Sequence, residues 1–288
     1  MSSNSPLIFA TLLVAVGGLA LRGRGRAHRA RVPASGSMDP LASGSMDPPA
    51  AVSGVAPAAT VALAAPWMHA VKKALNHGGT QRKGRDRSAA KRKHVQLATV
   101  DPVNGRPSVR TVVFRGFLPR KFVDGEKGGE SCCLMFITDD RSAKVRHLAA
   151  DGAPVEVCWW LDEPGVQFRI SGHARLANAK SDAAVLRSAI DDVWTRLGDS
   201  SRRTFFWPAP GEPVEAAAAS VDSKADSLHD SHFTLLLVVP DAVDELHLGG
   251  NQRRIVYERL DQDNATGTDE WPLASMGSAT WSEQAVNP

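Results

Sequence analysis

The sequence predicts a mainly β protein with helices, built as a small β-barrel with helices packed outside it. Two patterns predict this class: about six short runs of β-forming residues follow residue 94, and one long amphipathic segment interrupts them. Several short strands with an inserted helix are typical of small barrels. Neither a G-x-G-x-x-G that opens a helix after a strand nor a G-x-x-x-x-G-K-[ST] occurs, so no Rossmann or P-loop site is expected.

The first 64 residues lack the pattern of a folded domain. An apolar run from Pro6 to Leu21 precedes five arginines, and no acidic residue comes before Asp39. The run is shorter than the roughly 20 residues of a membrane span, and its basic residues follow it, whereas a secretory signal carries them in front. We therefore expect a disordered leader over 1–64 that is a transit peptide to a chloroplast or another organelle, without stable membrane association. A signal anchor and a misassigned start codon are the alternatives, and a chain without a transit peptide would be cytoplasmic.

The net charge of +3 divides unevenly along the chain. Residues 1–94 hold 14 Lys or Arg and 3 acids, which gives +11, and residues 95–288 hold 20 and 28, which gives −8. A net-acidic folded part attracts a phosphate backbone poorly, and the basic connector before residue 94 has no aromatic residues for base stacking. We expect no nucleic-acid partner.

Three cysteines, Cys132, Cys133 and Cys158, have no CxxC spacing and no histidines at metal-ligand intervals. Such a pattern predicts buried reduced thiols, with no disulfide framework and no metal site.

The folded part, residues 65–288, begins with a predicted helix after Pro66, since Pro suits the first helical turn. Predicted strands follow over 95–101, 108–117 and 131–139, then a short helix over 142–150. Two more strands are expected over 154–161 and 165–177, and an amphipathic helix over 180–197. A mobile loop over 209–231, strands over 232–240 and 244–248, the segment GGNQRRIVYERL and a last strand near 279–281 complete the prediction.

Two arginines, Arg110 and Arg115, stand five positions apart in RTVVFR. Residues an odd number apart point to opposite faces of a regular strand, so one arginine could reach a phosphate while the other faces a second ligand. Arginines at strand ends are also commonly just solvated.

These residues form part of a wider pattern. RTVVFR, TDDRSAK at 138–144 and VQFRISG at 166–172 resemble, in order and spacing, the flavin-binding elements of the pyridoxamine 5'-phosphate oxidase family, which has an FMN-binding split β-barrel. The chain is most similar to its plant-type members, with APW, VQLAT, GRPS-x-RTVVFRGF, NQR and a closing W-x-x-x-x-VNP. The resemblance covers about residues 65–288.

The resemblance implies FMN as cofactor, with Arg110 and Lys144 on its phosphate. A dianion needs charge-assisted donors, and arginine can bind it bidentately. Hydroxyls of Thr138 and Ser142 would add to this site. The whole implied cofactor set is Arg110, Thr111, Val112, Val113, Arg115, Ile137, Thr138, Ser142, Lys144 and Gln167.

The implied substrates are a vitamin B6 phosphate ester, pyridoxine or pyridoxamine 5'-phosphate, and O2. Arg115, Arg253 and Arg202 or Arg203 would contact the ester, although two arginines before an aromatic run also suit a helix C-terminus. The product would be pyridoxal 5'-phosphate, as in vitamin B6 salvage. The FMN would lie between two subunits, so a homodimer is implied, with Trp159 and Trp160 in the interface or the core. No catalytic triad or carboxylate pair is needed, because the cofactor carries the difficult electronics.

Some positions depart from the family pattern. Ala143 replaces a phosphate-side cation, Ile255 and Tyr257 stand where a histidine and a flavin-contacting arginine are common, and His247 replaces a flavin-contacting tryptophan. FMN binding is therefore better supported than the substrate. Another FMN-dependent oxidoreductase, such as a flavin or quinone reductase, and a non-catalytic flavin- or haem-binding protein remain alternatives.

Overall fold

A computed structural model of the chain describes residues 65–77, 90–150, 152–181, 183–214, 227–260, 274–277 and 279–288. The predicted leader, most of the basic connector and residues 215–226 of the predicted 209–231 loop lie outside these residues. No helix within the described ranges is long and apolar enough to cross a membrane.

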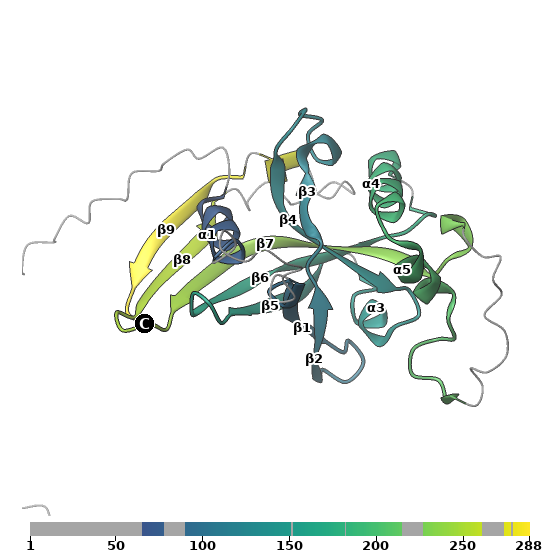
Figure 1. The fold of residues 1–288 in the computed structure, drawn as a ribbon, viewed down its shortest axis with the longest axis horizontal. Helices are drawn as coiled ribbons and strands as arrows, with labels where there is room; N and C mark the ends of the chain where they lie inside the picture. Colours follow the sequence, from purple (N-terminus) through teal and green to yellow (C-terminus); the bar gives the residue numbers. More distant parts are fainter. Residues whose placement is uncertain are drawn as a thin grey trace, which may run out of the picture. The chain divides into compact units, whose positions relative to one another are not determined.

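One antiparallel sheet forms the fold (Figure 1). The described part contains nine strands, where the sequence suggested about six, and the main path runs β2-β1-β5-β6-β7-β4-β3, with β8 paired to β7 and β9 to β8. The strands are β1 His94–Val100, β2 Pro107–Val113, β3 Gly116–Pro119, β4 Glu130–Asp139, β5 Ala153–Leu161, β6 Val166–Ala177, β7 Phe233–His247, β8 Arg253–Arg259 and β9 Trp281–Val286. The mainly β class predicted from the sequence is confirmed.

The predicted strand over 108–117 is wrong, because the chain changes partner in its middle. β2 pairs with β1 as far as Val113, and then Arg115 N–H donates to Met135 O (2.9 Å) and β3 pairs with β4. Gly116 has φ +121°, a conformation that side chains rarely allow. The switch connects the two ends of the strand order, which gives the sheet a barrel-like closure. Because the strand is broken here, simple alternation does not fix the relative directions of Arg110 and Arg115.

The two strands predicted over 232–240 and 244–248 are one strand, β7, which pairs with β4 along its first half and with β8 along its second. A register shift between β6 and β7 at Ser171/Gly172 leaves Asp241 as an extra residue in β7, and this bulge lets β7 bend instead of ending. Gly172 is needed there, since a Cβ at this position would lie 2.1 Å from Val239 O.

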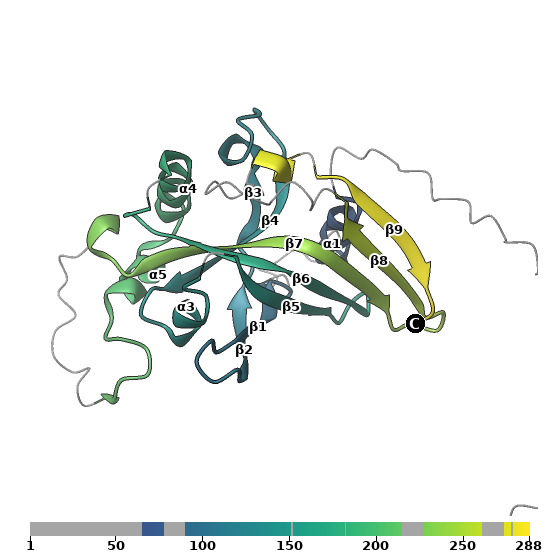
Figure 2. The same ribbon diagram turned by 180° about the vertical axis from the view of Figure 1, so that it is seen from behind.

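Helices lie on the outside of the sheet, as predicted (Figures 1 and 2). They are α1 Pro66–Leu75, α3 Ala143–His147, α4 Ala184–Thr195 and α5 Asp199–Arg203, with short 3-10 turns at Arg120–Phe122, Thr204–Phe206, Leu228–Asp230 and Ala274–Gly277. The turn at Leu228–Asp230 falls within the predicted loop. The last strand begins at Trp281, where the sequence pattern had placed its end.

Aromatic rings fill the core. Phe114 packs on Trp159, with ring centroids 4.7 Å apart, and Trp67 of α1 contacts Phe117 and Trp281. Trp159 is fully buried and its Nε1–H donates to Arg92 O (2.7 Å), whereas the next residue, Trp160, points outward and is 41% exposed. All three cysteines are free, and only Cys158 is not fully buried.

Candidate functional site

Arg110 and Lys144 meet at one end of the barrel, although they are 34 positions apart in the sequence (144 minus 110). Arg110 Nη1 donates to Thr99 Oγ1 (2.7 Å) and Leu97 O (3.0 Å), and its Nη2 donates to Ser108 Oγ (2.9 Å). Lys144 Nζ donates to Thr138 Oγ1 (3.0 Å) and Ser142 Oγ (3.1 Å). His147 Nδ1 lies 2.9 Å from Thr99 Oγ1. We call Arg110, Lys144, His147 and these four hydroxyl residues the cationic cluster.

Strand register explains half of this arrangement. Arg110 pairs with Leu97 and Ser108 with Thr99, so the four side chains share one face of the β1–β2 ladder. That face is the barrel interior, because Leu97 and Thr99 are both almost completely buried. Arg110, the middle residue of β2, therefore points toward the inside of the barrel.

The other half comes from the end of β4. Thr138 is the second-last residue of β4, and Ser142 precedes α3, so a turn of three residues brings their hydroxyl oxygens to 3.2 Å. Lys144, in the first turn of α3, then reaches back to both hydroxyls. The predicted association of Thr138, Ser142 and Lys144 with Arg110 is therefore present in the fold.

The cationic cluster is not ion-paired to an acid within the described residues, although the negative charge of Asp139 acts on Lys144 and partly opposes the lowering of its pKa. No carboxylate of a described residue lies within ion-pair distance of Arg110 or Lys144. The pKa of Lys144 is lowered, first by burial and then by the positive charge of Arg110, and burial also lowers the pKa of Arg110. Unpaired, half-buried cations beside several hydroxyls are suited to an anion with several oxygen atoms.

The residues expected near the flavin ring are divided between two faces. Thr111, Val113 and Gln167 lie on the outer face of the sheet, where Gln167 pairs with Trp160 of β5 and Leu246 of β7. Val112 lies on the inner face and is 8% exposed, so mainly its backbone remains available to a ligand. Ile137 is half-buried on β4, beside Thr138.

The arginines expected near the substrate are in three different places. Arg115 is exposed at the β2–β3 switch. Arg202 is held at a helix end, as the sequence also allowed, because it donates to Leu197 O (3.0 Å), pairs with Asp199 (3.1 Å) and lies over the Trp194 ring. Arg203 is exposed, with no partner among the described residues.

Arg253 lies in a pocket under α1, separate from the cationic cluster. The pocket has a volume of about 390 Å³, and α1 and strands β6 to β9 contribute to it. Figures 1 and 2 both show α1 beside β7 and β8. Its apolar wall includes Val166, Phe168 and Ile255. Its polar residues are Glu245, His247, Arg253, Tyr257 and Glu283 from the strands, His69 and Lys73 from α1, and His77 just after α1 ends.

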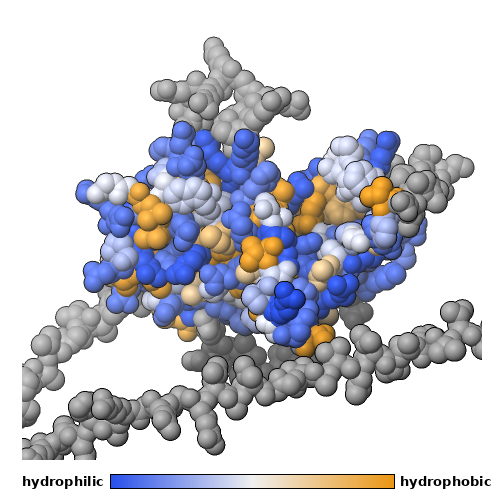
Figure 3. Space-filling model, turned by 90° about the horizontal axis from the view of Figure 1, so that it is seen from below, coloured by the Kyte–Doolittle hydropathy of each residue, from blue (hydrophilic) through white to orange (hydrophobic). Residues whose placement is uncertain are grey.

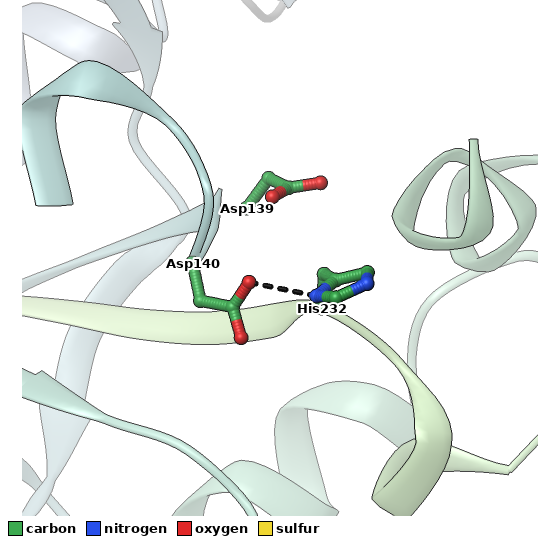
Figure 4. Close-up of side chains that lie close together, drawn as sticks. All are labelled: Asp139, Asp140 and His232. Atoms are coloured by element: carbon green, nitrogen blue, oxygen red, sulfur yellow. Dashed lines mark hydrogen bonds and ion pairs between the residues drawn. The ribbon is translucent and has the colours of Figure 1, made fainter. Parts of the chain in front are cut away.

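Three side chains outside these sites could come together on a metal ion: Asp139, Asp140 and His232 (Figure 4). Asp139 is already bound by Arg141 through two hydrogen bonds (3.0 and 2.7 Å), and Asp140 Oδ1 lies 2.8 Å from His232 Nδ1. The arrangement is explained by these ion pairs, which tie the end of β4 to the start of β7.

Several residues of both sites did not emerge from the sequence. Thr99 and Ser108 lie in the VQLAT and GRPS motifs, which gave a usable signal, whereas His147 had none. The sequence gives no signal for Glu245, because a carboxylate in an ordinary strand does not indicate that a distant helix will bury it.

Comparisons with known proteins agree with this architecture. Residues 64–178 match the family model described as pyridoxamine 5'-phosphate oxidase, FMN-binding domain. Pyridoxine/pyridoxamine 5'-phosphate oxidase 2 from Arabidopsis thaliana is 33% identical over 198 residues, which are 68% of this chain and 87% of that protein.

The chain is also similar to solved structures. A pyridoxamine 5'-phosphate oxidase-related, FMN binding protein from Nostoc punctiforme is 35% identical with a TM-score of 0.58, over 78% of this chain and 98% of that one. PhzG from Burkholderia lata, in complex with tetrahydrophenazine-1-carboxylic acid, has 19% identity and a TM-score of 0.45, over 69% and 83%. The chain therefore belongs to the pyridoxamine 5'-phosphate oxidase family of FMN-binding split-barrel proteins.

Proposed function

We propose that this protein oxidises pyridoxine or pyridoxamine 5'-phosphate to pyridoxal 5'-phosphate, with FMN as cofactor and O2 as final acceptor. The named activity of the Arabidopsis relative supports this substrate class. The structural observation that carries the proposal is the presence of two separate cationic sites, the cluster at the barrel end and the pocket with Arg253. FMN and the ester each carry one phosphate, so two sites are needed.

The cationic cluster fits the FMN phosphate. The guanidinium of Arg110 and the ammonium of Lys144 would provide charge-assisted donors, and the hydroxyls of Thr138 and Ser142 would donate as well. A dianion would relieve the repulsion between the two cations, which now lowers the pKa of Lys144. Ala143, the departure at a phosphate-side position, is exposed, so its missing charge would act mainly through solvent.

The pocket under α1 is proposed to receive the ester. Its volume is within the range of small-molecule sites, and it combines an apolar wall with a few polar side chains. Arg253 would bind the anionic group of the substrate, and Val166, Phe168 and Ile255 would exclude water from the ring. When bound, FMN supplies the two-electron acceptor chemistry that the side chains lack. The alcohol would yield an aldehyde and peroxide, and the amine an imine that hydrolyses with loss of ammonia.

A homodimer is part of the proposal. The two sites occupy different parts of one chain, and a second copy could bring its pocket to the cluster of the first. The outer face of β1, β2 and β5 exposes Val100 (47%), Val109 (64%) and Trp160 (41%), which would suit such a contact. The face seen from below is largely hydrophilic, with separate apolar patches (Figure 3).

A second candidate is a different FMN-dependent oxidoreductase of the same fold, such as a flavin or quinone reductase. One observation favours it: Tyr257 directs its hydroxyl to Glu245 (2.9 Å), so this departure does not supply a cation to the pocket. A different substrate could then occupy the site.

Peroxide release by the purified full-length protein tests the proposal. We expect peroxide with one or both phosphate esters and without a nicotinamide. A protein that oxidises NADPH with a quinone or free flavin, and is inactive toward both esters, would instead be the second candidate. A protein that binds flavin or haem and turns over none of these compounds would be a binding protein.

The FMN assignment is tested by replacing Arg110 and Lys144 with alanine together. We expect the double variant to be purified without FMN. Retention of FMN at the wild-type ratio would refute the assigned phosphate site.

A further inference from the structure

Glu245 is a buried carboxylate in the wall of the pocket under α1. It lies on β7, is 2% exposed and lines the pocket under α1. An ionised carboxylate is costly to bury unless it is paired and hydrogen-bonded. Its partners therefore indicate what this carboxylate does.

The β7–β8 hairpin gathers these partners on one face. Glu245 pairs with Ile255, His247 with Arg253 and Val243 with Tyr257, and residues two apart along a strand share a face. This face is the inner one, because Glu245 is also paired with the buried Phe168 of β6. The register thus places a carboxylate, an imidazole, a guanidinium and a phenol around one pocket.

Both oxygens of Glu245 are in use. Oε2 accepts a hydrogen bond from the Tyr257 hydroxyl (2.9 Å), and Oε1 lies 2.5 Å from His247 Nε2. Arg253 Nη2 is 3.6 Å from Oε1 and 3.0 Å from His247 Nε2. A single imidazole nitrogen cannot donate to a carboxylate and also accept from a guanidinium. A hydrogen on Nε2, donated to Glu245, satisfies the buried carboxylate, and Arg253 is then held by the same negative charge.

This arrangement determines the properties of the other ring nitrogen. With Nε2 protonated in the neutral ring, Nδ1 is a hydrogen-bond acceptor, and no described residue occupies it. His247 is 24% exposed, so Nδ1 is not sealed in the core. A carboxylate that fixes the tautomer of an imidazole also stabilises the imidazolium that forms when the ring accepts a proton.

We propose that His247, oriented by Glu245, accepts a proton from the substrate in the pocket under α1, with Glu245 as its positioning residue. This inference rests on the proposed function. Oxidation of a CH2–OH carbon to an aldehyde breaks one C–H bond and one O–H bond and forms the second C–O bond. The carbon loses a hydrogen together with two electrons. The cofactor, and then O2, would accept them. The hydroxyl proton passes to His247 Nδ1 and from there to solvent.

The amine substrate makes a similar demand. An ammonium group has no lone pair with which to form the C=N bond, so it must first lose a proton, and His247 can accept it. The charged and titratable groups that face His247 are Glu245 on its own strand, Arg253 and Tyr257 on β8, Glu283 on β9, His69 and Lys73 on α1, and His77 just after α1.

Kinetics of His247→Gln test the role of the imidazole. Loss of a general base lowers the rate roughly 100- to 10,000-fold, so we expect kcat for pyridoxine 5'-phosphate to fall at least about 100-fold with a much smaller change in KM. Glu245→Gln should lower kcat by roughly tenfold. This is the lower end of the loss of activity seen when a metal-bound histidine loses the partner that orients it. The kcat of both variants is expressed per bound FMN, so that a loss of cofactor is separated from a loss of the base.

A matched control is available in the same chain. His173 Nδ1 lies 2.5 Å from Asp241 Oδ2, which makes another carboxylate–histidine pair, but outside this pocket. His173→Gln should keep kcat within about twofold of the wild type. Wild-type kcat in His247→Gln, or an equal loss in His173→Gln, would overturn the proposal.

A tautomer measurement does not depend on turnover. In full-length protein with ¹⁵N-labelled histidine, the His247 signals, assigned with His247→Gln, should show the Nε2–H form when the ring is neutral. Glu245→Gln should show both forms. A neutral Nδ1–H ring in the wild type would overturn the inference, because that nitrogen could not accept a proton. If the protein turned over neither ester, the proposed function and the role toward this substrate would both fail, while the tautomer would still decide whether the oriented pair exists.

Discussion

Lys144 is expected to destabilise the FMN-free protein and to stabilise the FMN-bound one, so Lys144→Met should have opposite effects on the two forms. The variant removes a half-buried ammonium with which no described carboxylate forms an ion pair. Met keeps most of the side-chain volume. The two hydroxyls that lose Lys144 still contact each other, because Thr138 Oγ1 lies 3.2 Å from Ser142 Oγ. We expect the melting temperature of the FMN-free variant to rise.

FMN affinity should fall in the same variant. A hydrogen bond to a charged group contributes about 1.5–3 kcal/mol, and 1.4 kcal/mol corresponds to a tenfold change in Kd. The Kd of FMN is therefore expected to increase roughly 10- to 140-fold. Quenching of FMN fluorescence on titration into FMN-free protein measures it.

The pH dependence of folding stability provides a second test of the role of Lys144. The folded pKa of Lys144 is lowered, mainly by burial and then by Arg110. Below that folded pKa the lysine is charged in both states, and the folded state carries the whole penalty of burying it. As pH rises toward the unfolded value of about 10.4, the folded protein loses the proton first and the penalty shrinks. The stability difference between Lys144→Met and wild type should therefore decrease as pH increases through this alkaline range.

Arg146 of α3 provides the matched control, since it is an exposed cation two residues away. Arg146→Met removes the same charge but no donor in the cationic cluster, so its effect on the Kd should be under about threefold. The reasoning is refuted if Lys144→Met binds FMN within twofold of wild type, or if Arg146→Met weakens binding equally.

Three further outcomes are expected. If the active site joins the cluster of one subunit to the pocket of another, mixing inactive Arg110→Ala and Arg253→Ala chains should restore up to about a quarter of wild-type peroxide release. The reason is that half of the dimers are mixed and each mixed dimer has one intact site out of two. No recovery after verified subunit exchange would count against a shared site. Gly172→Ala should lower the free energy of unfolding, measured by urea titration, by about 1–3 kcal/mol or more, since its Cβ would lie 2.1 Å from a backbone oxygen. Gly198→Ala, whose Cβ would have no atom within 4 Å, should change it by much less. Tyr257 is the only tyrosine, and burial, followed by the charge of Glu245, raises its pKa, so the native protein should show no tyrosinate absorbance at 295 nm through about pH 11. The stability that this phenol contributes is complete below its unfolded pKa of about 10 and declines above it, so a native transition near pH 10 would contradict the buried hydrogen bond.

Local patterns were sufficient for most elements of the fold. The helix after Pro66, the alternation of β5 and β6 and the amphipathic helix near 184–195 depend on interactions within a few residues, and each was predicted close to its place. The predicted strand boundaries were wrong where a strand changes its pairing partner. Nothing in RTVVFRGF indicates that pairing passes from β1 to β4 at Arg115, because both halves have the same β-forming composition.

The candidate site was predictable only in part. The resemblance placed Arg110, Thr138, Ser142 and Lys144 in one site, and the fold brings them together. The roles of Arg202 and Arg203 were left open, and the structure ties Arg202 to its own helix end.

By itself, the sequence determined that the chain has a mainly β fold, which residues alternate between core and solvent, and which family it belongs to, since these follow from the order of residue types along the chain. Only the tertiary structure decided that no described carboxylate forms an ion pair with Arg110 or Lys144, and that Glu245 is buried against His247 and Tyr257. The physical reason is that burial and the pairing of charges depend on which distant elements pack together. The α1 helix covers one face of β7 and β8, and no local pattern in those strands specifies that contact.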